Sequence, residues 1–539
     1  MTNHLYYGDN LHVLRESIAT ESVDLIYLDP PFNSKRDYNL LFKSPKGEMS
    51  DAQITAFEDT WHWTHQTAGE FNQILHQSNT DVAELMQALR GFLGENDMLA
   101  YLTGMAIRLL ELHRVLKNMG SLYLHCDPTA SHYLKIVLDA VFGKENYRTE
   151  ISWKRSSAHN DAKQGRKQYG NIRDIIYFYT KTEDWKWNWL YSPYSESYIK
   201  DFYHYSEPET GRLYRLGDLT AAKPGGDTSY EFYGTKPYKG RYWAYSREKM
   251  ENFKLEERLY FPPNGGTPSY KRYLDEMAGV PLQNDWNDIK PVSKSEYLGY
   301  PTQKPLALLE RIIQASSNEG DVILDPFCGC GTAVHAAQKL KRDWIGIDIT
   351  NLAISLIEKR LKDAFPGITF DVCGTPKDLD SAKDLAKRDK YQFQWWACSL
   401  VNAQPYQGKK KGADGGIDGL IFFQDEANAS KKIIVSVKGG DNVGVAMVKD
   451  LIATVAREKA AIGLFLTLAP PTKVMRTEAI TAGFYSSPHH GDFPKIQILT
   501  IEGLLNGTEF AKYPDMAKGG LTFKKAVKES QLKEQPKLL

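Results

Sequence analysis

The sequence is poor in cysteine and contains no long apolar run. Five cysteines in 539 residues do not indicate a disulfide framework, and Cys328-x-Cys330 lacks the paired spacing of a zinc site. No stretch of about 18 apolar residues occurs, so we expect no membrane span. The first residues show no signal-peptide pattern, which favours a reducing cytoplasm as the location.

The chain also lacks net charge. Lysine and arginine number 67 together, as do aspartate and glutamate. This balance argues against indiscriminate coating of nucleic acid, but it leaves room for a local basic cleft. The length predicts two to four domains with sizeable cores.

The stretch that organises the chain is Asp29-Pro30-Pro31-Phe32, which closes the apolar run 23–28. It predicts a buried strand that stops abruptly, and in an open α/β sheet ligands bind at such strand ends. The Asp29 carboxylate and the Pro30 carbonyl could accept the two N–H groups of an exocyclic amine, while Phe32 stacks on a flipped base. For this motif alone, an ordinary strand-to-turn junction is the better interpretation.

A second strand-and-turn pattern lies near residue 325. The run 321–325 predicts a strand, Gly329 and Gly331 a tight turn, and residues 333–340 a helix. The next strand ends in Asp348, an acid suited to bind a ribose diol. Such a βαβ unit could equally serve a dinucleotide.

Two further polar positions are candidates. Asp9 follows a short strand at 5–8, where it could bind a ligand or cap the next helix. Its carboxylate would be available to a ligand if another residue, perhaps Asn10, caps the helix. His125, Cys126 and Asp127 look like metal ligands, but adjacent strand residues point to opposite faces. We expect them to have a structural or substrate-cleft role.

Together these motifs resemble the amino-methylating DNA methyltransferases of the β arrangement, over residues 5–370. The resemblance rests on 7–10, 29–32, 301–305 (Pro-Thr-Gln-Lys-Pro) and 325–332, in this order. It implies a Rossmann-like S-adenosylmethionine-dependent methyltransferase sheet. The implied catalytic residues are Asp29, Pro30, Pro31 and Phe32, and the implied cofactor-binding residues are Asp9, Asp29, Thr302, Lys304, Asp325, Phe327, Gly329, Gly331 and Asp348. Members of this family commonly have serine at the position of Cys330.

The resemblance also orders the domains. Residues 1–184 would form the catalytic half and 295–375 the cofactor-binding half. Residues 185–294, rich in tyrosine, glycine, proline and basic residues, would be an inserted target-recognition segment that contacts duplex DNA. An irregular insertion that covers one face of the core is the alternative.

After a charged linker at 376–390, residues 391–510 follow the order helix, strand, strand, helix, strand, which resembles the Mrr-type restriction-endonuclease-like fold. The family's chemistry would place Mg²⁺ at Asp418 and use Lys438. Ser436 replaces the usual acid or glutamine, and a hydroxyl is a weaker Mg²⁺ ligand. Endonuclease activity, DNA binding and assembly therefore all stay open. Residues 511–539 are expected to be a flexible tail.

The sequence thus predicts an adenine-N6 DNA methyltransferase of restriction–modification, associated with the nucleoid through DNA. Cytosine-N4 methylation, a combined methyltransferase–endonuclease and a DNA-binding module with vestigial methylation are the alternatives. A homodimer and a restriction subunit are candidate partners.

Overall fold

A computed structural model describes residues 3–31, 37–43, 49–58, 61–157, 167, 169–223, 225, 228–263, 265–300, 302–406, 416–426, 429–514, 522 and 525–529. The chain divides into two compact units. The first comprises Met1–Asn188 with Asn284–Lys533, and the second comprises Trp189–Gln283 with Glu534–Leu539. Among the described residues, no helix combines the length and apolarity needed to cross a membrane.

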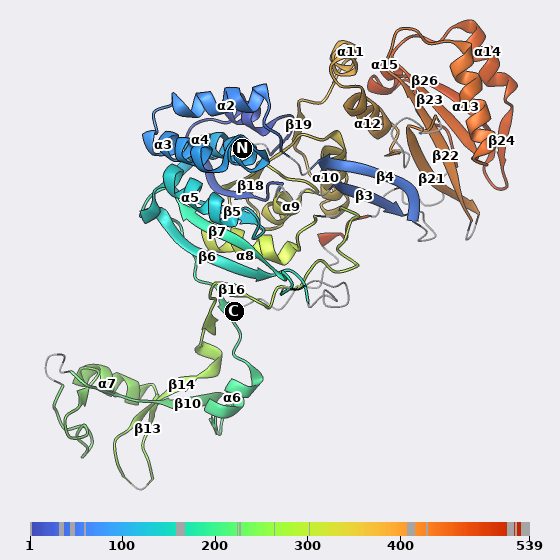
Figure 1. The fold of residues 1–539 in the computed structure, drawn as a ribbon. Helices are drawn as coiled ribbons and strands as arrows, with labels where there is room; N and C mark the ends of the chain where they lie inside the picture. The colour runs from blue at the N-terminus through green and yellow to red at the C-terminus, as the bar shows by residue number, and fades with distance from the viewer. Residues whose placement is uncertain are drawn as a thin grey trace. The chain divides into compact units, whose positions relative to one another are not determined.

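The first unit contains a nine-stranded sheet in the order β16-β6-β7-β5-β2-β17-β18-β1-β19 (Figure 1). Its strands from β5 to β19 run parallel, whereas β7 is antiparallel to both β5 and β6. The predicted α/β sheet is therefore confirmed. Its strands are β1 (His4–Tyr7), β2 (Val23–Leu28), β5 (Leu116–Cys126), β6 (Tyr147–Lys154), β7 (Arg173–Thr180), β16 (Asp285–Trp286), β17 (Val322–Asp325), β18 (Asp343–Asp348) and β19 (Asp371–Cys373).

Helices cover both faces of this sheet. Every residue of β2 is buried, as expected for a parallel strand between two helical layers. One apolar core includes α1 (Asn10–Ser17), α2 (His65–Leu75), α3 (Thr80–Leu93), α4 (Asp97–Val115) and α5 (Ser131–Phe142). The other includes α8 (Leu306–Ser316), α9 (Thr332–Lys339) and α10 (Asn351–Ala364). An antiparallel hairpin of β3 (Asp37–Lys43) and β4 (Met49–Glu58) lies outside this sheet.

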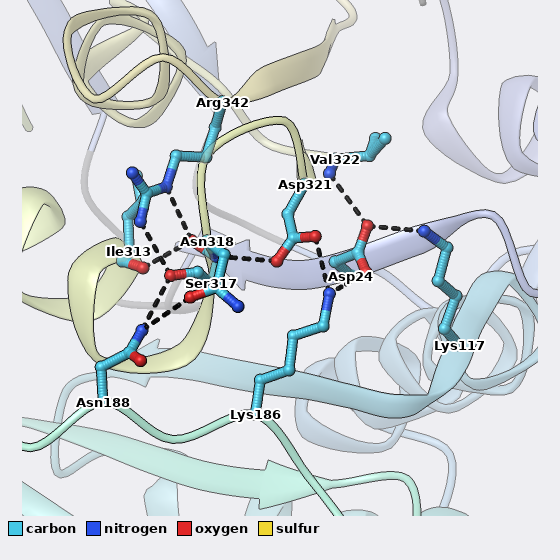
Figure 2. Close-up of polar contacts among 10 residues, drawn as sticks. All are labelled: Asp24, Lys117, Lys186, Asn188, Ile313, Ser317, Asn318, Asp321, Val322 and Arg342. Atoms are coloured by element: carbon cyan, nitrogen blue, oxygen red, sulfur yellow. Dashed lines mark hydrogen bonds and ion pairs between the residues drawn. The ribbon is translucent and has the colours of Figure 1, made fainter.

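The amino-terminal edge of the sheet holds an ion cluster around the buried carboxylate of Asp24, shown in Figure 2. Asp24 accepts hydrogen bonds from Lys117 at 2.7 Å and Lys186 at 2.8 Å, and Lys186 also pairs with Asp321 at 2.6 Å. The Asn188 amide donates to backbone carbonyls of α8 and of the loop that follows it. These bonds fix residues 186–188, directly before the chain enters the second unit.

The second unit has its own small core around Trp243, Phe232 and Met250. It contains a four-stranded sheet and two two-stranded sheets. The predicted target-recognition segment, 185–294, thus contains a compact unit at 189–283, and its recognition role stays a prediction. Its elements are β8 (Tyr191–Ser192), α6 (Glu196–Phe202), β9 (Tyr205–Ser206), β10 (Leu213–Gly217), β11 (Thr220–Ala221), β12 (Tyr242–Trp243), α7 (Arg247–Leu255), β13 (Leu259–Tyr260), β14 (Ser269–Tyr273) and β15 (Val280–Pro281).

The carboxyl-terminal part of the first unit forms a five-stranded sheet in the order β20-β21-β22-β23-β26. The predicted order of helix, strand, strand, helix and strand is present, with a short additional strand after the first helix and a further helix, hairpin and strand after the last predicted strand. The predicted linker contains α11, whose Ala382 and Leu385 are buried. The elements are α11 (Leu379–Arg388), α12 (Lys390–Leu400), β20 (Gln404–Pro405), β21 (Gly419–Glu426), β22 (Ala429–Lys438), α13 (Val445–Arg457), β23 (Ile462–Thr467), α14 (Lys473–Thr481), β24 (Phe484–Ser487), β25 (Gly491–Pro494), β26 (Ile496–Thr500) and α15 (Ile501–Leu505).

Described residues of the predicted tail, among them Lys512, Thr522 and Glu529, make hydrogen bonds with the rest of the first unit. The Thr522 hydroxyl accepts from the backbone N–H of Phe422 at 3.1 Å. Glu529 lies 2.5 Å from His335 Nε2 on α9 and also pairs with Lys339. The flexibility predicted for 511–539 as a whole stays a prediction.

Candidate functional site

A pocket of about 350 Å³ lies where the parallel strands β2, β17 and β18 end. Because these carboxyl ends meet at one edge, side chains from distant parts of the sequence converge there. Phe32 lies outside the described residues, and Gly331 forms the amino-terminal cap of α9. The other residues implied by the methyltransferase resemblance all line the pocket, namely Asp9, Asp29, Pro30, Pro31, Thr302, Lys304, Asp325, Phe327, Gly329 and Asp348. His125, Cys126 and Asp127 are not among the residues that line it.

Asp29 and Lys304 form an ion pair inside this pocket. Their side chains are only 16% and 10% exposed, so the pair is largely removed from water. Lys304 contacts Oδ2 of Asp29, whereas the buried Oδ1 has no hydrogen-bond partner within the described part of the chain. Since a buried carboxylate oxygen normally has a partner, Oδ1 is a ready acceptor for a ligand donor.

Two more carboxylates make the pocket acidic. Burial raises the pKa of Asp325 well above its ordinary value, and the charges of Asp29 and Asp348 raise it further. Burial also raises the pKa of Asp348 to about 6, although hydrogen bonds from Thr350 and from the Gly329 N–H oppose this rise. Several carboxylates so close together favour a ligand that carries positive charge.

The glycine turn after β17 has little spare room. Gly329 and Gly331 have φ angles of +50° and +75°, which side chains rarely adopt. A Cβ atom on Gly331 would lie 2.8 Å from Cγ1 of Ile357. The Gly329 N–H donates to Oδ2 of Asp348 at 2.9 Å, so the turn also orients that acid.

Asp9 has two roles in the structure. Its Oδ1 accepts from the Leu11 N–H at 2.8 Å, so Asp9 itself caps α1 and the alternative with Asn10 as the cap is wrong. The Asn10 amide instead donates to the Pro326 carbonyl, which ties α1 to the turn after β17. Asp9 still lines the pocket because its side chain remains 39% exposed.

Arg108 and Trp61 line the pocket next to Asp9 and were not among the candidate residues. Arg108 pairs with Asp9 at 3.2 Å and donates to Asn10 Oδ1 at 2.7 Å. Its guanidinium lies 5.9 Å from the centre of the Trp61 ring. An arginine within the apolar sequence of α4 was the available signal, because a buried cation needs partners.

The candidate endonuclease residues also come together, but with a different bonding pattern. Oδ1 of Asp418 accepts from the Gln394 amide at 2.7 Å, and Oδ2 accepts from the Val437 N–H at 2.6 Å. Lys438 lies 4.0 Å from Oδ2, and Ser436 is buried. Among the described residues, no group of three or more His, Cys, Asp or Glu side chains could hold a metal ion. These donors therefore do not fit Mg²⁺.

An α/β sheet with an acidic pocket at its carboxyl edge defines a nucleotide-type site. The family described as DNA methylase matches residues 23–359, more than half of the chain, and the protein belongs to this family. Residues 398–506 match the family described as NACHT-associated inactive Restriction Endonuclease 1. This second match supports an endonuclease-like module, while the Mrr type stays a prediction.

Curated relatives agree with this family. Type II methyltransferase M.EcaI of Enterobacter cloacae is 32% identical over 48% of this chain and 57% of its own length. The type III restriction-modification enzyme StyLTI Mod subunit of Salmonella typhimurium is 28% identical over 62% of this chain and 50% of its own length. DNA adenine methyltransferase YhdJ of Escherichia coli is 25% identical over 66% of this chain and 82% of its own length. The chain spans about half the length of the first two.

Proposed function

We propose that the protein is a site-specific DNA methyltransferase that transfers a methyl group from S-adenosylmethionine to N6 of adenine in duplex DNA. The observation that carries this proposal is the acceptor Oδ1 of Asp29, buried and without a partner among the described residues, directly before Pro30 in the pocket. The relationship to YhdJ, named an adenine methyltransferase, supports adenine as the base.

The pocket residues explain how a weakly nucleophilic amine would react. The lone pair of the adenine amine is delocalised into the ring, so acceptors for both of its N–H bonds favour a more tetrahedral, reactive nitrogen. Asp29 and the Pro30 carbonyl are those acceptors, and Pro31 stiffens the turn that holds them. Phe32 would stack on the flipped base. No strong general base is needed, because the methylated amine is cationic and acidic.

The acidic end of the pocket would hold the methyl donor. Asp348 would accept from the ribose hydroxyls, Asp325 would face the amino-acid end with Phe327 beside it, and Asp9 would bond the adenine. Thr302 and Lys304 would border the methionine end, and Gly329 would let the ligand approach the backbone. When bound, S-adenosylmethionine supplies a methyl group on a positively charged sulfur, which suits a pocket rich in carboxylates.

The second unit would contact DNA and select the sequence. Exposed aromatic side chains such as Tyr233, Tyr238 and Phe261, among many lysines and arginines, suit contacts with phosphates and bases. Cytosine-N4 methylation uses the same geometry and is the second candidate function, because cytosine also presents a conjugated amine.

The endonuclease-like module would act without cutting DNA. Both oxygens of Asp418 accept hydrogen bonds from the protein, which favours assembly or DNA binding over Mg²⁺ chemistry. The likeness to a type III Mod subunit suggests a restriction subunit as partner, and a homodimer is a second possible assembly. In this role the protein would work in the cytoplasm, associated with the nucleoid through DNA.

The substitution Asp29→Ala tests the proposal. It should abolish methyl transfer from radiolabelled S-adenosylmethionine to unmethylated genomic DNA, while the dissociation constant for the cofactor stays within about threefold. Asp127→Ala is the matched control, since Asp127 also precedes a proline at a strand end but does not line the pocket. Normal turnover in Asp29→Ala would contradict the assignment.

A further inference from the structure

A buried chain of hydrogen bonds begins at the pocket wall. Tyr27 lines the pocket, and its hydroxyl lies 2.9 Å from Nδ1 of His125 on β5. Nε2 of His125 lies 3.1 Å from Oδ2 of Asp174 on β7. Tyr27, His125 and Asp174 are 2%, 0% and 2% exposed, so this chain crosses three strands away from water.

The direction of the donors follows from the charge states. Burial, together with the nearby charges of Asp29, Asp325 and Asp174, raises the pKa of Tyr27 well above its ordinary value, so the hydroxyl keeps its proton. Burial alone would raise the pKa of Asp174, but the hydrogen bond from His125 and nearby positive charges lower it, so Asp174 is an ionised acceptor. A neutral His125 ring then carries its hydrogen on Nε2, which faces the Asp174 carboxylate, and its Nδ1 accepts from Tyr27.

This polarity determines what Tyr27 presents to the pocket. Its single hydroxyl proton is committed to His125, so the oxygen can only accept on its remaining side. A rotating hydroxyl would offer either a donor or an acceptor, whereas a locked one needs no reorganisation when a charge arrives. The Asp174 carboxylate, which also pairs with Arg155 at 3.2 Å, holds the histidine in this orientation.

Tyr27 also occupies a central position in the pocket. Tyr27 lies near the end of β2, two residues before Asp29, and both residues line the pocket. On the other side, β17 pairs with β2 through Leu324 and Ile26, so Asp325 comes next to Tyr27. Tyr27 thus shares the pocket with the acid assigned to the target base and the acid assigned to the cofactor.

We propose that His125 and Asp174 lock the Tyr27 oxygen as an acceptor for the positively charged sulfur centre of the methyl donor. The pocket would then bind the sulfonium of S-adenosylmethionine more tightly than the neutral thioether of S-adenosylhomocysteine. The inference rests on the proposed function, because it takes S-adenosylmethionine as the donor. Tyr27 and Asp174 were not among the candidate residues, and His125 was expected only to have a structural or substrate-cleft role.

Calorimetric titration of both compounds into the full-length protein tests this directly. Tyr27→Phe keeps the ring but removes the oxygen, so the preference for S-adenosylmethionine over S-adenosylhomocysteine should fall about tenfold. Tyr123→Phe is the matched control. Tyr123 lies opposite Tyr27 in the β2–β5 register, is equally buried and bonds Ser316 at 2.7 Å, but does not line the pocket. The preference of Tyr123→Phe for S-adenosylmethionine over S-adenosylhomocysteine should match that of the wild type.

If the ratio of the affinities for S-adenosylmethionine and S-adenosylhomocysteine in Tyr27→Phe stays within twofold of the wild-type ratio, the inference is overturned while the proposed function stays intact. Failure of the wild type to bind either compound would count against the proposed function as well. A second measurement needs no variant: ¹⁵N NMR of histidine-labelled wild type, with the His125 signals assigned by substitution. Hydrogen on Nε2 alone is expected, and hydrogen on Nδ1 would overturn the locked orientation.

Discussion

Two acids of the pocket, Asp29 and Asp348, differ in whether both carboxylate oxygens have hydrogen-bond partners. Asp29 keeps one buried oxygen without a partner among the described residues, which suits a group that must receive a substrate donor. Both oxygens of Asp348 already accept hydrogen bonds from Thr350 and Gly329, which fix its position. In the proposed function, the first acid would receive the amine of the target base and the second would hold the cofactor in place.

Protonation of Asp348 gives a pH prediction. Because its pKa is raised to about 6 by burial, the carboxyl becomes largely neutral as the pH falls below 6 in the empty protein. A neutral carboxyl is a weaker acceptor for ribose hydroxyls, so the affinity for S-adenosylmethionine should rise with pH from 5 to about 6.5 and then level off. Calorimetry across this range measures it. A flat profile would contradict the assigned role of Asp348.

Asp24 at the opposite edge of the sheet gives a stability prediction. Burial alone would raise the pKa of this carboxyl, but hydrogen bonds from Lys117, Lys186 and the Val322 N–H lower it. Asp24→Asn should reduce the free energy of unfolding by about 2 kcal/mol, because it removes a buried carboxylate that accepts hydrogen bonds from two lysines and one backbone N–H. Urea unfolding at neutral pH measures the change, with Lys117→Met, at a 42% exposed partner, as the milder control.

The stabilisation from Asp24 also has a pH dependence. Since its pKa is lowered in the folded protein, the contribution is present above the ordinary value of 3.8 and is lost as the pH falls through the lower native value. Equal unfolding midpoints of Asp24→Asn and the wild type at pH 7 would contradict this account.

At the scale of elements, β2 and β17 were predictable because their apolar runs end in Asp-Pro and are followed by turn residues. The tight turn at Gly329 and Gly331 was equally predictable from the sequence, since a positive φ is a local requirement that glycine meets. The Asp29–Lys304 ion pair could not be predicted from the sequence, because the two residues are 275 positions apart and only the fold brings their loops together. The same holds for Arg108, whose partner Asp9 lies on a different element.

Helix α12 links the endonuclease-like fold to the cofactor pocket. Trp395 packs against a small cluster of Tyr300, Cys330 and Leu352, and the first two of these line the pocket. The adjacent Gln394 bonds Asp418. The side chain that resembles a nuclease acid thus helps to hold a helix that supports the methyltransferase.

This arrangement predicts that Trp395→Ala weakens binding of S-adenosylmethionine by about tenfold, because Tyr300 and Cys330 lose packing beside the glycine turn. Calorimetry of the full-length variant measures the affinity. Tyr391→Ala is the matched control, since Tyr391 lies on the same helix but is 63% exposed. Unchanged affinity in Trp395→Ala would show that α12 does not shape the pocket.

At the scale of the whole molecule, the first unit contains both the pocket and the endonuclease-like module, and the second unit is the inserted stretch 189–283 together with 534–539. The order of these parts was predictable from motif order and composition. The hydrogen bonds of Asp418 could not be predicted, because their donors, the Gln394 amide and the Val437 N–H, are brought together only by the fold. Those hydrogen bonds, together with Ser436 in place of an acid, argue against a metal site at Asp418.

We therefore expect no metal-dependent cleavage by this protein. Plasmid DNA incubated with the protein and Mg²⁺ should stay intact on agarose gels, as it should for Asp418→Ala. Methyl transfer should be equal with Mg²⁺ and with EDTA, because no pocket residue requires a cation. Mg²⁺-dependent fragmentation that disappears in Asp418→Ala would contradict the bonding argument.

The central claim is methyl transfer to adenine N6, and nucleoside mass spectrometry tests it most directly. Unmethylated genomic DNA is incubated with the full-length protein and S-adenosylmethionine, digested to nucleosides and analysed beside the Asp29→Ala sample. The account predicts N6-methyladenine with the wild type and none with the variant. N4-methylcytosine would correct the base while keeping the chemistry of Asp29 and Pro30, and the absence of any methylated nucleoside would contradict the proposed function.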